Sequence, residues 1–348
     1  MGPNESASSQ QPTQLLQGDA ELLRRASEGF TRLRSEIAKV IIGQEAIVRQ
    51  LLAAIFAQGH TLIIGVPGLA KTLLVKTLSQ ALGWSFKRIQ FTPDMMPADI
   101  IGMELLQEDR ATGARTMRFL RGPVFANVIL ADEINRTPPK TQSALLEAMQ
   151  EYNVTSMGKG YPLERPFIVM ATQNPIEQEG TYPLPEAQLD RFMFSLWVDY
   201  PSVTEEEDIV LATTAPQDTT VREVFAREEM MAFQDLVRRI PVSRHVVGYA
   251  VALARSTRPL GGTAGDYVKQ YVEWGAGPRA SQYMVLAGKA LAVLDGLTTV
   301  SAEHIRQAAP FVLRHRVLPN YNATGEGITA HQIVEKVLAE IKEPDYRK

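Results

Sequence analysis

The sequence contains no cysteine, which excludes disulfide bonds and metal centres ligated by thiolates. Its five histidines are scattered without the spacing of metal ligands, so we interpret them as structural or surface residues. No apolar run approaches the ~20 residues that cross a membrane, and the sequence does not open with a signal-peptide pattern. These absences predict a soluble, cytoplasmic protein without membrane insertion.

Long basic runs are also absent, and the formal net charge is −3 at pH 7. A constitutive nucleic-acid binder usually carries a basic patch, so we do not expect a nucleic-acid partner. Apolar residues make up 45% of the 348 residues, which is enough to build the cores of two domains.

The pattern along the chain predicts a tail and two domains. Residues 1–18 are rich in Ser, Gln, Pro and Asn and are expected to be disordered. Residues 19–200 alternate helical patterns with short apolar strands, which is typical of a parallel sheet with helices on both faces. Residues 201–348 show helical patterns and no convincing strand, so an all-α domain is expected there. The five expected strands span 61–64, 86–91, 128–131, 167–171 and 192–198, with hairpin inserts near 100–124 and 152–165.

A glycine-bearing loop joins the first strand to Lys71 and Thr72 at the start of a helix. This order is typical of a phosphate-binding loop, in which backbone N–H groups and the helix dipole hold phosphates. We expect Lys71 to contact the β- and γ-phosphates of ATP and the Thr72 hydroxyl to ligate Mg²⁺. Ala70 replaces the usual glycine, and its methyl group should suit a helical backbone. The expected nucleotide contacts are Gly65, Val66, Pro67, Gly68, Leu69, Ala70, Lys71, Thr72 and Leu73. Taken alone, an ordinary strand–turn–helix with a surface lysine is the alternative.

Polar residues follow two further strands. Asp132 and Glu133 end the apolar run at 128–131, where acids at the carboxyl edge of a parallel sheet face the ligand crevice. Asp132 is expected to hold Mg²⁺ and Glu133 to activate water as a general base. Asn174 follows the next strand, where its amide could orient the attacking water, although Asn-Pro alone is simply a turn.

These motifs resemble the AAA+ ATPases of the MoxR type, within the helix-2-insert branch. The resemblance runs from about Leu33 to about Ile341, and the alanine in the phosphate loop looks like a trait of this type. It implies a P-loop αβα sandwich with a five-stranded parallel sheet, followed by an all-α lid. The segments that carry it are Gly65–Thr72, Ala131–Arg136, Ala171–Pro175 and Leu184–Phe192.

The resemblance also implies roles outside the loop and the acids. Ile41 and Ile42 would lie against the adenine, and Arg279 would be the lid arginine that senses the nucleotide. Arg191 is similar to the arginine finger that reaches a neighbouring subunit's γ-phosphate, with a structural salt bridge to Asp190 or Glu186 as its alternative. Arg136 is either an intersubunit contact or a surface arginine, and the two hairpins face either a pore or a partner.

The sequence thus predicts a Mg²⁺-dependent ATPase. By resemblance it assembles into a homo-oligomeric ring, a hexamer, and remodels or activates a partner, often a von Willebrand factor A domain protein, or aids metal-cofactor insertion. Two alternatives remain. One is a nucleic-acid motor, which should carry basic residues on its hairpins, whereas the 152–165 insert has Lys159 and Arg165 against Glu164. The other is a nucleotide switch without hydrolysis, against which Glu133 and Arg191 argue.

Overall fold

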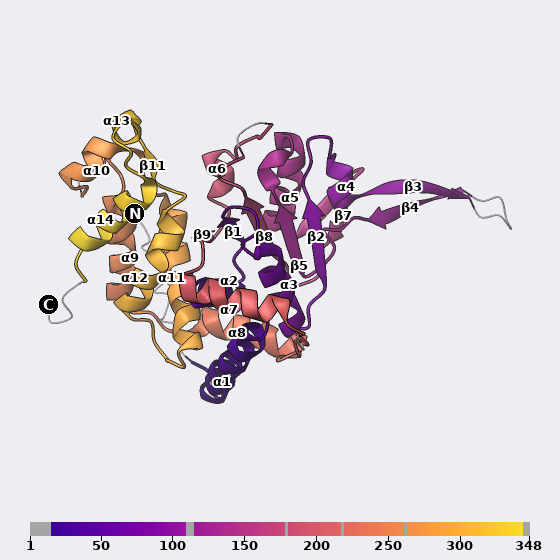
Figure 1. Ribbon diagram of the computed structural model, residues 1–348, viewed down its shortest axis with the longest axis horizontal. Helices are drawn as coiled ribbons and strands as arrows, with labels where there is room; N and C mark the ends of the chain where they lie inside the picture. Colours follow the sequence, from indigo (N-terminus) through magenta and orange to yellow (C-terminus); the bar gives the residue numbers. More distant parts are fainter. Residues whose placement is uncertain (1–14, 109–114, 178–179, 217–218, 261–262, 344–348) are drawn as a thin grey trace, which may run out of the picture.

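A five-stranded parallel sheet forms the centre of the N-terminal part in the computed structural model (Figure 1). The structure describes residues 15–108, 115–177, 180–216, 219–260 and 263–343. The strand order is β2-β5-β8-β1-β9, and every neighbouring pair is parallel. The predicted parallel sheet is confirmed. Its strands are β1 (Thr61–Ile64), β2 (Phe86–Gln90), β5 (Val128–Asp132), β8 (Ile168–Gln173) and β9 (Phe194–Trp197).

Helices cover both faces of this sheet because successive strand residues point to opposite sides. Ile63 and Leu130 join the core beneath α1 (Asp19–Ala38), α2 (Glu45–Phe56) and α3 (Lys71–Ala81). Leu62 and Ile129 join a second core with α5 (Pro139–Glu151). Of the expected disordered tail, residues 1–14 lie outside the described residues, and α1 begins soon after, at Asp19.

Two hairpins project from the sheet domain where inserts are expected. One pairs β3 (Gly102–Glu108) with β4 (Arg115–Arg121), after the short helix α4 (Pro97–Ile101). The other pairs β6 (Asn153–Ser156) with β7 (Lys159–Pro162). Tyr161 stacks on Phe119 with ring centroids 3.9 Å apart, and its hydroxyl donates to Glu104 at 3.2 Å. The bases of the two hairpins are therefore joined, while the far end of β3–β4 extends into solvent (Figure 1).

The C-terminal part is a helical lid. Its helices are α7 (Val203–Thr214), α8 (Arg227–Arg239), α9 (Arg244–Ser256), α10 (Asp266–Tyr271), α11 (Pro278–Leu294), α12 (Ala302–Leu313), α13 (Tyr321–Gly325) and α14 (Ala330–Glu340). It also contains a small antiparallel ribbon of β10 (Val272–Trp274) with β11 (Leu318–Pro319), which the sequence did not predict. Strands of three and two residues are too short to show a period-2 pattern.

The first lid helices pack back onto the N-terminal helices. Gln234 on α8 donates a 2.9 Å hydrogen bond to the Ile55 carbonyl of α2. Arg239 pairs with Asp19 at 2.8 Å. The core beneath the sheet therefore continues across residue 200, and the expected domain boundary there stays a prediction. Among the described residues, no helix is both long and apolar enough to cross a membrane.

Candidate functional site

The carboxyl ends of the central strands open onto a cavity of about 410 Å³. Parallel strands end at one edge of the sheet, so segments that are distant in sequence meet there. The cavity brings together most of the predicted phosphate loop, both acids and the predicted sensor amide. Its lining residues are Pro67, Gly68, Leu69, Ala70, Lys71, Thr72, Leu73, Arg88, Asp132, Glu133, Thr172, Gln173 and Asn174.

The backbone of the phosphate loop requires glycine at two positions, but at Ala70 it does not have the helical conformation that we expected. Gly68 has φ +87°, a left-handed conformation that glycine adopts without cost. At Gly65, a Cβ would lie 2.7 Å from the Val198 carbonyl oxygen, so glycine is required for space. Ala70 caps α3 with φ 53° and ψ 18°. The expected fit to a right-handed helical backbone is therefore wrong, and Ala70 carries the strain of a left-handed residue.

Lys71 lies folded against its own loop. Its Nζ donates to the carbonyls of Gly65 at 2.7 Å and Val66 at 2.6 Å. Burial lowers the pKa of Lys71, while the nearby charges of Asp132 and Glu133 oppose this shift. Lys71 thus lines the cavity within the electrostatic range of both carboxylates.

Asp132 is almost fully buried, and both of its carboxylate oxygens have partners. The Thr172 hydroxyl donates to Oδ1 at 2.6 Å. Arg88 on β2 donates to Oδ2 through Nε at 2.9 Å and through Nη2 at 2.7 Å. Thr172 also accepts the Glu133 backbone N–H at 2.9 Å, so one hydroxyl fixes both acidic residues.

Glu133 stands in an unusual backbone conformation, with φ 56° and ψ 51°. Non-glycine residues in this region cost on the order of 1 kcal/mol and cluster at functional sites. Its Oε2 accepts from Gln90 at 2.8 Å and from Arg136 at 3.0 Å. Arg136 pairs with Glu177 as well, at 3.0 Å. Within this chain, Arg136 therefore anchors the acid rather than standing as a free surface residue.

Asn174 follows β8 and forms a local turn, as the Asn-Pro alternative suggested. Its Oδ1 accepts the Ile176 N–H at 3.2 Å, and its Nδ2 lies 3.4 Å from a Glu177 carboxylate oxygen. The same residue lines the cavity beside Glu133. Turn geometry and a position for orienting water are thus compatible.

The residues of the cavity fit ATP with Mg²⁺. Thr72 and Asp132 offer the oxygen ligands that Mg²⁺ prefers, and both line the cavity. The described part of the chain contains no cluster of three or more His, Asp or Glu side chains that could hold a metal unaided. Mg²⁺ usually takes one or two protein oxygens and completes its shell with phosphates and water, so this sparse set suits a nucleotide-bound ion.

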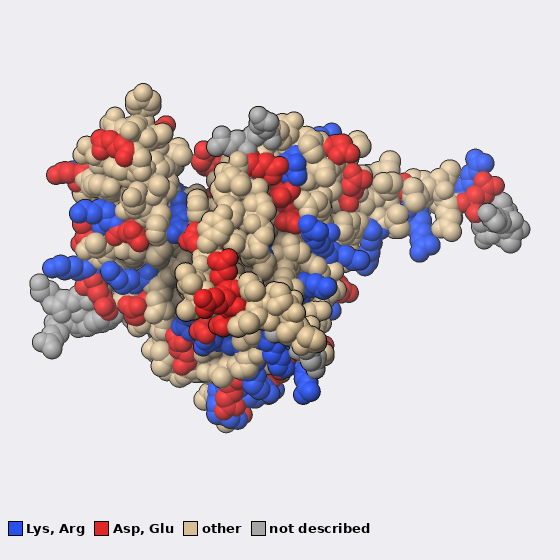
Figure 2. Space-filling model, in the orientation of Figure 1, with Lys and Arg blue, Asp and Glu red and all other residues tan. Residues whose placement is uncertain are grey.

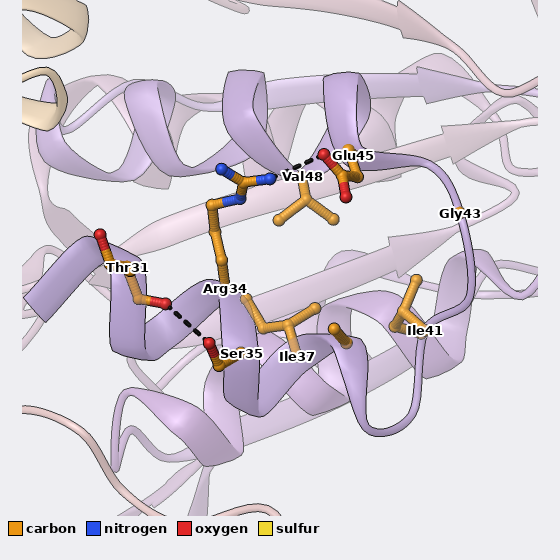
Figure 3. A pocket seen from close by; sticks show the side chains of 9 residues that line it. Thr31, Arg34, Ser35, Ile37, Ile41, Gly43, Glu45 and Val48 are labelled. Carbon is orange, nitrogen blue, oxygen red and sulfur yellow. Dashed lines mark hydrogen bonds and ion pairs between the residues drawn. The ribbon is translucent and has the colours of Figure 1, made fainter.

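Ile41 and Ile42 are not among the residues that line this cavity. Ile41 is buried and lines a separate pocket of about 330 Å³ between α1 and the start of α2 (Figure 3). Arg34 and Glu45 form a 2.7 Å ion pair across that pocket. The expected contact of these isoleucines with adenine stays a prediction.

Arg191 and Arg279 also lie outside the cavity lining, and Arg279 pairs with the residue directly before Arg191. Asp190 pairs with Arg279 at 2.9 Å and with the buried Arg316 at 2.7 Å. The Arg191 guanidinium has no hydrogen bond or ion pair to any residue that the structure describes. The alternative of a salt bridge to Asp190 or Glu186 is therefore not seen.

Comparison with known proteins then identifies the family. Residues 60–194 match the family described as "ATPase family associated with various cellular activities (AAA)", and residues 266–337 match the "AAA lid domain". Chaperone MoxR1 of Mycobacterium tuberculosis is 40% identical over 329 residues, which cover 94% of this chain and 85% of the relative. The chain belongs to the MoxR-type AAA+ ATPases.

Other relatives agree with the MoxR type. The uncharacterized protein YeaC of Bacillus subtilis is 42% identical over 89% of this chain and 93% of its own length. Protein MoxR of Methylorubrum extorquens is 32% identical over 86% of this chain and 90% of its own. The crystal structure of a proposed ATPase from Cytophaga hutchinsonii matches with a TM-score of 0.85 and 37% identity, over 93% of this chain and 98% of that chain. The predicted P-loop AAA+ fold with a helical lid is confirmed.

Sequence reasoning missed three residues of this MoxR-type site, namely Arg88, Gln90 and Thr172. Arg88 and Gln90 lie two apart on β2 and so share one face of the strand. Gln90 is directly opposite Asp132 in the parallel register. The polar residues Arg88 and Gln90, two apart on one strand face, were the signal that could have found these two.

Proposed function

We propose that this protein hydrolyses ATP with Mg²⁺ and uses the energy to remodel or activate a partner protein. The observation that carries the proposal is the single cavity that gathers the loop at 67–73, Asp132, Glu133 and Asn174. A bound nucleotide with Mg²⁺ would supply a polarised γ-phosphoryl group. The residues of the chain would bind it, orient water and move a proton.

Each side chain takes a role that matches its position. Lys71 would exchange the carbonyls of its own loop for phosphate oxygens, aided by the N–H groups that open α3. Thr72 and Asp132 would hold Mg²⁺. Glu133 would accept a proton from the attacking water, with Asn174 orienting that water. Gln90 and Arg136 hold the carboxylate of Glu133 by hydrogen bonds, and these contacts fix its direction.

The arginines outside the cavity support a site shared between subunits. Arg191 is unpaired within the described chain and lies beside Asp190, the partner of Arg279. A guanidinium delivered by a neighbouring subunit can stabilise the charge of the transferring phosphoryl group. We therefore propose a homo-oligomeric ring, by family resemblance a hexamer, in which Arg191 and Arg279 both face the next subunit's nucleotide.

The partner is proposed from surface chemistry and from the family. On one face of the β3–β4 hairpin, Met103, Leu105 and Leu120 are exposed and form an apolar surface without cover in the described chain. Such patches commonly mark contacts with other proteins. A chaperone-like action on a von Willebrand factor A domain protein, or help in metal-cofactor insertion, fits this surface, and one relative carries the name Chaperone MoxR1.

The nucleic-acid motor gains little from the hairpins. β4 carries Arg115, Arg118 and Arg121, but β3 sets Glu104 and Glu108 beside them. Both signs of charge are visible on the projecting hairpin in Figure 2. Such mixed charge does not form the basic stripe that phosphate backbones require.

The decisive experiment measures ATP turnover and ADP binding in parallel across a series of protein concentrations. Wild type should show rising specific activity as subunits associate. Glu133→Gln should bind ADP as wild type does and lose roughly 10²- to 10⁴-fold in turnover, the usual contribution of a general base. Glu151→Gln, an exposed carboxylate at the end of α5, is the matched control and should behave as wild type.

Three outcomes would count against the proposal. Absence of ADP binding would remove the nucleotide function altogether. If the wild type binds ADP but turns over ATP no faster than Glu133→Gln, the nucleotide switch without hydrolysis would be favoured. Stimulation of turnover by DNA, with no response to a partner protein, would favour the motor.

A further inference from the structure

Arg88 donates hydrogen bonds to Asp132, the carboxylate that the proposed function assigns to Mg²⁺. Its Nε and Nη2 both donate to Oδ2 of Asp132, at 2.9 Å and 2.7 Å. The side chain of Arg88 is 48% exposed, whereas that of Asp132 is 11% exposed. The aspartate is thus held in place, while the arginine has room to leave.

The remaining hydrogen-bonding capacity of Asp132 is small. A carboxylate has about four lone-pair sites, two on each oxygen. Two on Oδ2 are taken by Arg88 and one on Oδ1 by Thr172. A divalent cation that used the last site, directly or through water, would lie close to the positive guanidinium and be repelled by it.

We propose that the Arg88 guanidinium competes with the divalent cation for the Asp132 carboxylate, so that the cation binds only when the guanidinium moves away. We call this contact the Arg88 latch. The threonine contact on Oδ1 is neutral and can persist, so it keeps the carboxylate aimed into the cavity in both states. Arg88 is therefore a positioning residue whose release accompanies metal binding. The inference depends on the proposed function only for the metal role of Asp132.

The latch also reaches the second acid. Arg88 Nη2 donates to the Gln90 side-chain oxygen, and the Gln90 amide donates to Glu133 at 2.8 Å. If Arg88 leaves Asp132, its hydrogen bond to Gln90 changes as well. The hydrogen bond from Gln90 to Glu133 then changes with it. A single β2 face therefore connects the metal-binding acid with the general base.

The test measures Mn²⁺ binding to the ADP-loaded protein, from the loss of the free-ion electron paramagnetic resonance signal beyond the loss that ADP alone causes. Mn²⁺ accepts the same oxygen ligands as Mg²⁺. Arg88→Ala should lower the dissociation constant about three- to fivefold, the range for losing competition from a partly exposed ion pair. Arg88→Lys keeps the positive charge, so its dissociation constant for Mn²⁺ should stay close to that of wild type. Arg88→Gln removes the charge but keeps hydrogen-bond donors, and it should lower the dissociation constant as Arg88→Ala does. It replaces Arg88→Ala if the alanine variant is unstable.

Two controls separate the latch from the proposed function. Arg24→Ala removes an exposed arginine of α1 that pairs with Glu21 and Glu28, and it should leave Mn²⁺ binding unchanged. Asp132→Asn should weaken binding, and in that background Arg88→Ala should have no further effect. If Asp132→Asn binds Mn²⁺ as wild type does, the metal role and the latch both fail. If Asp132→Asn weakens binding but folded Arg88→Ala and Arg88→Gln leave the constant unchanged or raise it, only the latch is overturned.

Discussion

At the scale of single residues, this site holds backbone conformations that its amino acids do not prefer. Ala70 and Glu133 are both left-handed, although neither is glycine. Glu133 directly follows β5, and Ala70 is the last residue of the phosphate loop before α3, so both lie at sharp turns of the chain that line the cavity. Strain of this kind persists only where the surrounding structure fixes it, as Thr172 does for the Glu133 N–H.

Ala70→Gly should therefore stabilise the protein. Removing the methyl group relieves the left-handed strain at φ 53°, and the gain in unfolding free energy should be about 0.5–1 kcal/mol after the extra entropy of the unfolded glycine. Urea denaturation measures it. The matched control is Ala252→Gly within α9, where a helical alanine is replaced and a loss of about 1 kcal/mol is expected. If Ala70→Gly lowered the free energy of unfolding as much as Ala252→Gly does, Ala70 would not be strained.

At the scale of elements, the sequence predicted what local pattern can specify. Most of the sheet strands carry apolar runs bounded by turns, and the phosphate loop is a contiguous motif, so both were found. The Arg88 and Gln90 contacts were not, because they depend on β2 pairing with β5, which brings residues more than 40 positions apart into contact. The packing of α8 on α1 and α2 was missed for the same reason, since no local pattern encodes a partner in the other half of the chain.

His60 shows how one buried group joins several of these elements. Its Nδ1 accepts the Val169 N–H of β8 at 3.0 Å, and its Nε2 lies 3.1 Å from the Met149 carbonyl of α5. The imidazole is therefore neutral, with the proton on Nε2. Burial lowers the pKa of His60 to about 4, against an opposing effect of the Met149 carbonyl.

Stability should consequently fall in mild acid. Below pH 6.5 the unfolded histidine takes up a proton that the folded one refuses until about pH 4, so the loss grows through this window and then levels off. At about 1.4 kcal/mol per pKa unit, the full loss is about 3 kcal/mol. His60→Asn keeps an acceptor but cannot titrate, so its stability should approach that of wild type as the pH falls. Urea midpoints of both proteins between pH 7.5 and 4 measure this, and a constant difference would refute it.

At the scale of the whole molecule, the lid is fastened to the segment that carries Arg191. Arg316, just beyond α12, is buried and donates to the carbonyls of Asp190 at 2.8 Å and Phe192 at 2.7 Å. Phe311 of α12 contacts Phe194 of β9, with ring centroids 6.1 Å apart. A displacement of the loop at 190–193 would therefore move α12 with it. In the proposed ring, this coupling would transmit a movement at the neighbouring subunit's nucleotide to the lid.

A subunit-mixing experiment tests whether sites are shared in this way. Lys71→Ala removes the phosphate lysine but leaves Arg191 intact, and Arg191→Ala does the reverse, so each variant alone should be inactive. In an equal mixture, about a quarter of the sites should combine an intact loop with an intact finger, and that share of ATP turnover should return. The control mixes Arg191→Ala with the double variant Lys71→Ala/Arg191→Ala, which supplies no finger and should recover nothing. Co-assembly is verified by native mass spectrometry, and failure of verified mixed rings to regain activity would show that each subunit completes its site alone.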